Sequence, residues 1–240
     1  MNKKITFIIP AAGNSTRFGK SDKVFYKLDN EKTILENTID KIEKISRQIV
    51  IVLNNNNYIP SKNLFKNKKY FKKITFIKQS KVKGTAIAIR DALKIIEEKI
   101  VGVIWSDQIG LSKKTIKFCI HKFDSRKMHI IVPINFSNNC YTNVVLNENN
   151  NVKDIRNRSN SKKIMKKGFN DCGFFIFNKK KIFKQLNKNI KNNNLLNFKS
   201  EYDFLNLFKN LNEKNSTSII SKEKKDILGI NTKKDINKFK

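Results

Sequence analysis

The chain has 240 residues, of which 39% are hydrophobic, and this length and apolar content predict a folded globular domain over residues 1–240 rather than a disordered chain. The formal net charge is +31, from 51 lysines and arginines against 20 aspartates and glutamates. Nucleic-acid-binding proteins usually cluster their cations and favour arginine, whereas lysine is spread along this whole chain, so we expect no nucleic-acid partner.

Strands and helices alternate over residues 1–111. Apolar runs predict buried strands, and apolar residues at helical spacing predict helices. One of these helices begins at Thr33, which forms a capping-box sequence with Glu36. The strands are expected at 5–9, 48–53, 74–78 and 101–105 and the helices at 33–46 and 85–99. An irregular polar segment with at most one helical turn is expected at 54–73. The alternation predicts an α/β fold with a doubly wound, mostly parallel sheet, which binds ligands beyond the carboxyl ends of its strands.

The second half, residues 112–240, has a different pattern that predicts a small β-rich lid subdomain. NVVLNENNNVKDIR predicts a hairpin that turns at 148–151, and EYDFLNLFKNLNE at 201–213 predicts an amphipathic helix. Further strands are expected at 129–134, 172–177 and 226–230, a surface loop at 187–194 and a polar helix from Lys233.

A turn of small residues follows the first strand. Ala11, Ala12 and Gly13 precede Arg17 and Lys23 in the stretch IIPAAGNSTRFGKSDKVFYKL. The backbone N–H groups of such a turn can approach an anion closely, Arg17 can donate two hydrogen bonds to a phosphate, and Lys23 adds a point charge. The turn matches neither the P-loop nor the dinucleotide-binding fingerprint. These residues alone leave two readings open, an anion site and an ordinary strand-to-helix turn of a lysine-rich chain.

The cysteines and the apolar segments indicate the compartment. Cys119, Cys140 and Cys172 form no CxxC pair, and with only two histidines they lack the spacing of a zinc site. They are expected to be reduced thiols. The apolar core near the N-terminus has about five residues, fewer than a secretion signal needs, and no stretch is long enough to span a membrane. We therefore expect a cytoplasmic protein with no membrane partner.

The stretch with the small-residue turn resembles the signature loop of nucleotide-diphospho-sugar pyrophosphorylases, the sugar-1-phosphate nucleotidylyltransferases. Their pattern is A-A-G-x-[GS]-[ST]-R, followed a few residues later by P-K. Asp22 stands in place of the proline, so Lys20 is an alternative to Lys23 for the lysine of the pattern. The resemblance implies catalytic roles for Arg17 and Lys23, and nucleotide binding by Ala11, Ala12, Gly13, Asn14 and Ser15.

Four further stretches follow in the order of the family. QSKVKGTAIAI is similar to the base-binding segment of the uridylyltransferases, and GVIWSDQIGL to a strand that ends at a metal-binding aspartate. NDCGFFIF resembles a strand of the sugar pocket, and DILGINTKKDI resembles a late segment whose asparagine helps to hold the metal. The resemblance implies nucleotide binding by Gln79, Gly84 and Thr85, with Thr85 as the cap of the next helix, Mg²⁺ binding by Asp107 and Asn231, and sugar binding by Tyr141, Asp171 and Gly173.

The resemblance also implies a Rossmann-like sheet of the glycosyltransferase-A type, with a nucleotide-binding half at 1–111 and a sugar-binding half with the lid at 112–240. The implied reaction joins a nucleoside triphosphate, with UTP favoured, to a sugar 1-phosphate and gives an NDP-sugar and pyrophosphate. The implied cofactor is Mg²⁺, and a homo-oligomer is a possible assembly. A bifunctional chain with a β-helix acetyltransferase unit is not expected.

Three features keep alternatives open. The acidic sugar contact expected at 156–159 is absent, which favours a CTP-dependent cytidylyltransferase that acts on a non-sugar phosphate. The charge of +31 leaves a basic nucleic-acid-binding protein as a less favoured alternative. The departures from the family patterns also leave open a third alternative, a homologue that binds nucleotide without turning it over.

Overall fold

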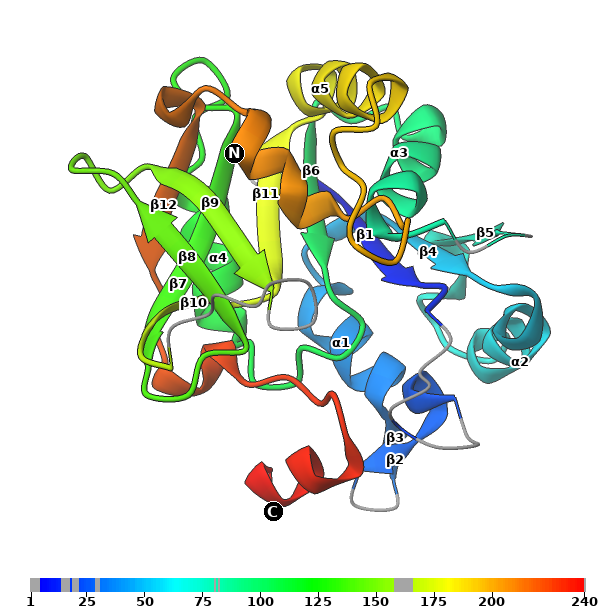
Figure 1. The fold of residues 1–240 in the computed structure, drawn as a ribbon. Coiled ribbons are helices and arrows are strands. Elements are labelled where there is room, and N and C mark those ends of the chain that lie inside the picture. The colour runs from blue at the N-terminus through cyan, green and yellow to red at the C-terminus, as the bar shows by residue number, and fades with distance from the viewer. Residues whose placement is uncertain are drawn as a thin grey trace.

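The central feature of the fold is a sheet with helices on both faces (Figure 1). The computed structural model describes residues 5–13, 18, 22–28, 31–79, 81, 83–157 and 166–239. Within them the sheet has eight strands, with β12 beside β7 and the others in the order β10-β7-β11-β6-β1-β4-β5. Its strands are β1 (Ile5–Ala11), β4 (Ser46–Leu53), β5 (Ile74–Lys78), β6 (Ile100–Ile104), β7 (Ile130–Ser137), β10 (Gly168–Asp171), β11 (Phe174–Asn178) and β12 (Ser216–Ile220). The helices are α1 (Ile34–Ile42), α2 (Asn55–Phe65), α3 (Thr85–Ile95), α4 (Lys113–Lys122) and α5 (Lys179–Lys191).

The predicted α/β sheet is confirmed. β1 pairs in parallel with β4 and with β6, and β4 pairs in parallel with β5. β11 is antiparallel to β6 and β7, and β10 is antiparallel to β7, while β12 runs parallel to β7. Because β1 lies between β4 and β6, the carboxyl ends of these three strands meet at one edge, where ligands of such sheets bind.

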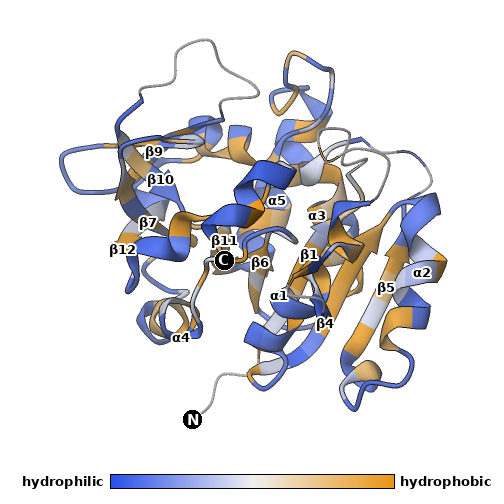
Figure 2. Cartoon of the chain, turned by 90° about the horizontal axis from the view of Figure 1, so that it is seen from below, coloured by the Kyte–Doolittle hydropathy of each residue, from blue (hydrophilic) through white to orange (hydrophobic). Residues whose placement is uncertain are grey.

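Alternate residues of the central strands supply two apolar cores, one on each face of the sheet. Ile8 and Val50 belong to the core covered by α3 and α5. Phe7 and Ile51 belong to the core covered by α1, α2 and α4. Figure 2 shows the hydrophobic strands between helices whose outer surfaces are hydrophilic. Burial on both faces explains why these strands are nearly continuous apolar runs in the sequence.

Helix α1 begins as the sequence predicts. Thr33 Oγ1 accepts the N–H of Glu36 at 3.1 Å, and Glu36 Oε2 accepts the N–H of Thr33 at 2.9 Å. Helix α3 begins at the predicted residue but ends at Ile95, short of the predicted end at residue 99.

Helices α2 and α5 differ from the sequence-based expectation. α2 lies within the segment predicted to be irregular, because its buried residues are Asn57, Ser61 and Phe65 and give no apolar period. A loop was predicted at 187–194, but α5 continues to Lys191, so the loop prediction is wrong for residues 187–191. No element was predicted where α4 lies.

In the second half the predicted hairpin is confirmed as β8 (Thr142–Leu146) and β9 (Val152–Asn157), which pair antiparallel apart from the main sheet. The strand predicted at 172–177 is confirmed as β11, which begins only at Phe174, because Gly173 has a φ of +63° and separates β11 from β10. The helices predicted at 201–213 and from Lys233 are 3₁₀ helices, Phe204–Asn210 and Lys233–Lys238, and the second lies at the C-terminus marked in Figure 1.

The strand predicted at 226–230 is wrong. The segment begins in a 3₁₀ helix, Lys224–Ile227, and the last strand of the described chain is β12. Buried Asp226 accepts the N–H of Ser112 and the hydroxyl of Thr115, so this segment is tied to the loop before α4 instead of pairing with a strand.

The three cysteines are buried and free, as predicted for reduced thiols. Burial raises the pKa of Cys119 to about 12 and raises the pKa of Cys172 well above its ordinary value. In the part of the chain that the structure describes, no helix is long and apolar enough to cross a membrane.

Candidate active site

Lys23 and Asp107 meet at the carboxyl edge of the sheet. Lys23 lies in a 3₁₀ turn, Lys23–Phe25, whose N-cap Asp22 accepts the N–H of Val24 at 3.3 Å. Asp107 follows β6. Lys23 Nζ lies 2.5 Å from Asp107 Oδ2, and the two side chains are 14% and 20% exposed. The fold thus brings the predicted catalytic cation and the predicted metal ligand into direct contact.

The loop after β6 is also held by the segment that contains Asn231. The N–H of Ile230 donates to the carbonyl oxygen of Asp107 at 3.0 Å. Asn231 follows directly, and its N–H donates to Asp235 Oδ2 at 3.1 Å. The two residues predicted to bind Mg²⁺ therefore belong to backbone segments that are in contact.

The donor set at this edge is suited to a hard cation. Asp107 offers a partly exposed carboxylate that already faces the ammonium group of Lys23. No group of three histidine, cysteine, aspartate or glutamate side chains able to hold a metal occurs among the described residues. Mg²⁺ commonly binds through one or two protein oxygens together with substrate phosphates, so the residues present fit Mg²⁺ and do not resemble a zinc site.

Lys41 of α1, which the sequence did not single out among the many lysines, supports the loop after Asp107. Its Nζ donates to the carbonyl oxygens of Gln108 at 2.9 Å and Ile109 at 2.5 Å. Burial lowers the pKa of Lys41 from 10.5 to about 7.

Lys41 is expected to make stability depend on pH. Because its pKa is lower in the folded than in the unfolded chain, the unfolded chain binds more protons between pH 7 and 10.5, and this contribution to stability rises with pH. Urea unfolding at pH 7, 8 and 9 should give a steeper rise for the wild type than for Lys41→Met, by at most about 1.4 kcal/mol per pH unit. Equal slopes in the two proteins would show that Lys41 is charged in the fold.

Two asparagines at the start of α2 hold the turn after β1. Asn57 Nδ2 donates to the carbonyl oxygen of Ala11 at 2.7 Å, and Asn54 Nδ2 to that of Ala12 at 3.2 Å. Beside the exposed Gly13 a Cβ would meet no atom of the described residues within 4 Å. Sequence reasoning missed the asparagines because it expected an irregular segment with at most one helical turn here. Asn14, Ser15 and Arg17 lie outside the described residues.

Gln79, directly after β5, is buried, and neither its Nε2 nor its Oε1 has a hydrogen-bond partner in the described part of the chain. Its N–H donates to the carbonyl oxygen of Leu53 at 2.7 Å, which fixes the backbone beside the end of β4. A buried amide without partners is costly and calls for an explanation such as a ligand. A group with one donor and one acceptor would satisfy it.

The segment after Gln79 departs from the expectation for Thr85. The N-cap of α3 is Gly84, and no side chain caps this helix, so the prediction that Thr85 is the cap is wrong. Thr85 Oγ1 instead accepts the N–H of Phe204 at 2.9 Å. Gly84 has a φ of +99°, and a Cβ there would lie 2.4 Å from the carbonyl oxygen of Tyr202. The close contact with the Tyr202 backbone is therefore enough to require glycine at this position, without a contact to a nucleotide.

Gly84→Ala is expected to destabilise the protein by about 1–3 kcal/mol, because the left-handed backbone disfavours a Cβ and Tyr202 blocks it. Urea unfolding measures this loss. Gly13→Ala is the matched control for stability, since its Cβ would meet no atom within 4 Å in the part of the chain that the structure describes. Equal unfolding midpoints for Gly84→Ala and the wild type would contradict the packing of Gly84 against Tyr202.

The residues predicted on the sugar side are tied into the sheet next to Asp107. Asp171 Oδ1 accepts the N–H of Gly173 at 2.8 Å, and Asp171 Oδ2 accepts the hydroxyl of Thr142 at 2.5 Å. Burial raises the pKa of Asp171. A Cβ on Gly173 would lie 2.6 Å from Gln108 Oε1, so the start of β11 lies against the loop that carries Asp107.

Asn170 joins the hairpin to the sheet and was missed by sequence reasoning. Its Oδ1 accepts the N–H groups of Tyr141 at 3.0 Å and Thr142 at 2.8 Å. The backbone of the predicted sugar residue Tyr141 is thus fixed to β10.

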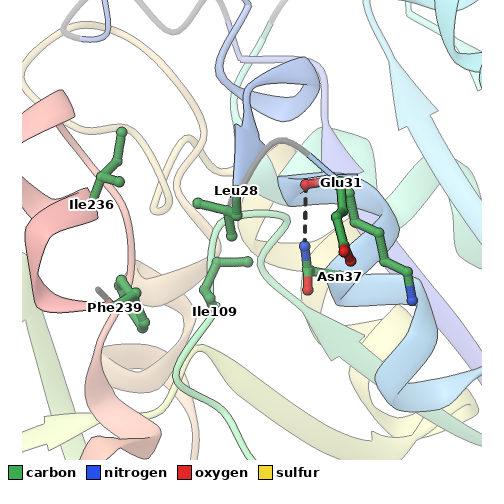
Figure 3. A pocket seen from close by; sticks show the side chains of 7 residues that line it. Leu28, Glu31, Asn37, Ile109, Ile236 and Phe239 are labelled. Carbon is green, nitrogen blue, oxygen red and sulfur yellow. Dashed lines mark hydrogen bonds between the residues drawn. The ribbon is translucent and has the colours of Figure 1, made fainter.

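A pocket of about 340 Å³ lies apart from these residues (Figure 3). Apolar side chains from the C-terminal segment face Leu28 and Ile109 across it, and none of the predicted site residues lines it. Its lining combines apolar side chains with Glu31, Lys32 and Asn37, and Lys32 is the one cation among them. The lining residues are Leu28, Glu31, Lys32, Asn37, Ile109, Ile236 and Phe239.

Known proteins resemble the chain in sequence and in fold. The "Bifunctional protein GlmU" of Caldicellulosiruptor saccharolyticus is 28% identical over 246 residues, which cover 98% of this chain and 51% of that protein. The chain thus spans about half the length of this curated relative.

Three solved structures share the fold. HddC from Yersinia pseudotuberculosis superimposes with a TM-score of 0.72 at 20% identity, over 98% of this chain and 100% of that one. UDP-glucose pyrophosphorylase complexed with UDP-glucose gives 0.70 at 16% identity, with 98% of both chains covered. The inositol-1-phosphate CTP transferase from T. maritima gives 0.65 at 14% identity, over 91% of this chain and 85% of that one.

The model of the MobA-like NTP transferase domain family matches residues 7–162, which include β1, the turn at Gly13, Lys23 and Asp107. The match covers more than half of the chain, and the resemblance to the nucleotide-diphospho-sugar pyrophosphorylases is confirmed. The chain belongs to the MobA-like NTP transferase domain family.

Proposed function

We propose that the protein transfers a nucleotidyl group from a nucleoside triphosphate, with UTP favoured, to a sugar 1-phosphate, and releases pyrophosphate in a Mg²⁺-dependent reaction. The observation that carries this proposal is the contact of Lys23 with Asp107 at the sheet edge where the turn at Gly13 also lies. Residues 1–240 would act as one domain, with the nucleotide bound by 1–111 and the sugar phosphate by 112–240.

The chemistry needs positioned charges more than a nucleophilic side chain. A sugar phosphate is already an anionic nucleophile, and the barrier comes from repulsion between two polyanions and from charge that develops on the α-phosphate. The backbone N–H groups of Ala12 and Gly13 would hold the triphosphate, and Lys23 would donate to the reacting phosphates. We assign the leaving pyrophosphate to Arg17. In-line attack on the α-phosphate follows from this arrangement.

Asp107 and Asn231 would hold Mg²⁺, which when bound would neutralise phosphate charge. The close contact of the two backbone segments supports this assignment. Tyr141, Asp171 and Gly173 would border the sugar, since their segment lies against the loop that carries Asp107.

Gln79 is expected to recognise the base. Gln79→Leu should lower kcat/KM for the preferred triphosphate roughly 10- to 100-fold, because two hydrogen bonds of about 0.5–1.5 kcal/mol each are lost. The same change should stabilise the free protein, since a buried amide without described partners becomes apolar. Steady-state kinetics and urea unfolding measure the two effects. Gln48→Leu is the matched control, because Gln48 donates a hydrogen bond to Thr75 within the sheet. Unchanged kinetics in Gln79→Leu would show that Gln79 does not recognise the base.

A substrate screen tests the proposed reaction. UTP, CTP, ATP and GTP are each combined with hexose 1-phosphates and with non-sugar phosphates such as phosphocholine, and pyrophosphate release is measured. UTP with a hexose 1-phosphate is expected to give the highest kcat/KM. No release with any pair would overturn the proposal in favour of nucleotide binding without turnover.

A cytidylyltransferase that acts on a non-sugar phosphate is the second candidate. The amide of Gln79, which has no partner among the described residues, offers a donor and an acceptor and can therefore pair with cytosine as well as with uracil. The likeness in fold to an inositol-1-phosphate CTP transferase is compatible with this alternative. Release of pyrophosphate only with CTP would establish it.

A further inference from the structure

Asn54 and Asn57 use the oxygen ends of their side-chain amides to begin α2. Asn54 Oδ1 accepts the N–H groups of Asn56 at 2.9 Å and Asn57 at 3.0 Å, and Asn57 Oδ1 accepts the N–H of Asn54 at 2.8 Å. These bonds form a capping box, which aspartates would satisfy equally well. The cap therefore explains the two oxygens but not the two NH₂ groups.

The NH₂ groups hold the peptide planes of the turn after β1. Asn57 Nδ2 donates to the carbonyl oxygen of Ala11 and Asn54 Nδ2 to that of Ala12, and both asparagines are buried. In a planar trans peptide the N–H points opposite to the C=O. Because both carbonyls point to α2, the N–H groups of Ala12 and Gly13 must point away from it.

Asn57 also reaches the segment that carries Lys23. Its Nδ2 donates to Asp22 Oδ2 at 2.9 Å, and Asp22 in turn caps the turn that contains Lys23. Asp22 has a φ of −67°, the value that a proline ring imposes. The pair of Asp22 with Asn57 thus takes the place of the proline that the family pattern has before its lysine.

We propose that Asn54 and Asn57 are positioning residues that aim the backbone N–H groups of Ala12 and Gly13 at the triphosphate and place Lys23 beside them. This inference rests on the proposed function. The helix cap does not need the two NH₂ groups, and this inference assigns a role to each of them. It follows that asparagine, rather than aspartate or serine, is required at both positions.

The test replaces each asparagine with aspartate, which keeps the cap acceptor, removes the donor and faces the carbonyl with a second oxygen. Asn54→Asp and Asn57→Asp are compared with Asn56→Asp, which adds the same charge at an exposed residue between them. The KM for the triphosphate is expected to rise at least tenfold in the first two variants and to stay within twofold in the control. The KM for the sugar phosphate should agree with the wild type in Asn54→Asp and Asn56→Asp. The urea midpoint should agree with the wild type in Asn56→Asp and fall in Asn54→Asp, because a buried carboxylate then faces the carbonyl oxygen of Ala12.

A second readout does not depend on turnover. Inorganic triphosphate is titrated while the amide resonances of Ala12 and Gly13 are followed by NMR. These resonances are expected to shift in the wild type and in Asn56→Asp. In Asn54→Asp the Kd for triphosphate obtained from these shifts is expected to be at least tenfold higher.

Each outcome separates this inference from the proposed reaction. Equal triphosphate affinity in Asn54→Asp and Asn56→Asp would overturn the positioning role, and so would a wild type that does not bind triphosphate. A wild type that binds triphosphate through these amides but releases no pyrophosphate would support the positioning role while the proposed reaction fails. In Asn57→Asp the new carboxylate faces that of Asp22. If this variant does not fold, the comparison of Asn54→Asp with Asn56→Asp tests the positioning role.

Discussion

Asp107→Ala is expected to abolish Mg²⁺-dependent pyrophosphate release while the fold is retained. Asp107 is the carboxylate at the end of β6 that faces Lys23, and its removal takes away the charged oxygen proposed to hold the metal. Its side chain is partly exposed, and the loop is still held by the backbone bond from Ile230 and by Lys41. Pyrophosphate release is measured over a Mg²⁺ titration, and thermal unfolding checks the fold.

Asp124→Ala is the matched control for this change. Asp124 is also an aspartate in a close ion pair, with Arg126, but it lies after α4 and away from the proposed site residues in sequence. Activity of Asp124→Ala should equal that of the wild type. Wild-type turnover in Asp107→Ala, at any Mg²⁺ concentration, would refute the metal assignment.

Lys23→Gln is expected to lower kcat by about 10²–10³, equivalent to about 3–4 kcal/mol, because one preorganised donor to the developing charge is lost. Glutamine retains a donor to Asp107 but not the positive charge, so the fold of the turn should persist. Single-turnover measurements with saturating triphosphate separate this effect on chemistry from weaker binding.

Lys20→Gln decides between the two lysines of the signature stretch. Lys20 lies outside the described residues, whereas Lys23 contacts Asp107. Lys20→Gln is expected to retain kcat within a few-fold. A loss of activity in Lys20→Gln together with near-normal activity in Lys23→Gln would transfer the catalytic role to Lys20.

Local patterns were sufficient where one side chain or one period controls the structure. The capping box of Thr33 and Glu36 correctly placed the start of α1. The apolar runs correctly placed the strands of the first half, because residues buried on both faces of a sheet must be apolar. The hairpin of β8 and β9 followed from its alternation and its asparagine-rich turn.

The failures occurred where distant contacts control the structure. α2 is stabilised by asparagine caps and by the turn after β1, so it shows no apolar period. The segment at 226–230 has the composition of a strand, but Asp226 bonds to Ser112 and the segment remains outside the sheet. Thr85 follows a glycine that the backbone of Tyr202 requires, so its hydroxyl bonds to Phe204 instead of capping α3.

The sequence by itself determined the α/β class, the order of the central strands along the chain and the family, because these depend on periodicity and on short contiguous motifs. Only the tertiary structure decided that Lys23 reaches Asp107, that Gln79 is buried without a described partner, and that Asn54 and Asn57 hold the turn at Gly13. These contacts join residues from different strand ends. Their distances depend on the order and direction of strands in the sheet, which no local pattern encodes.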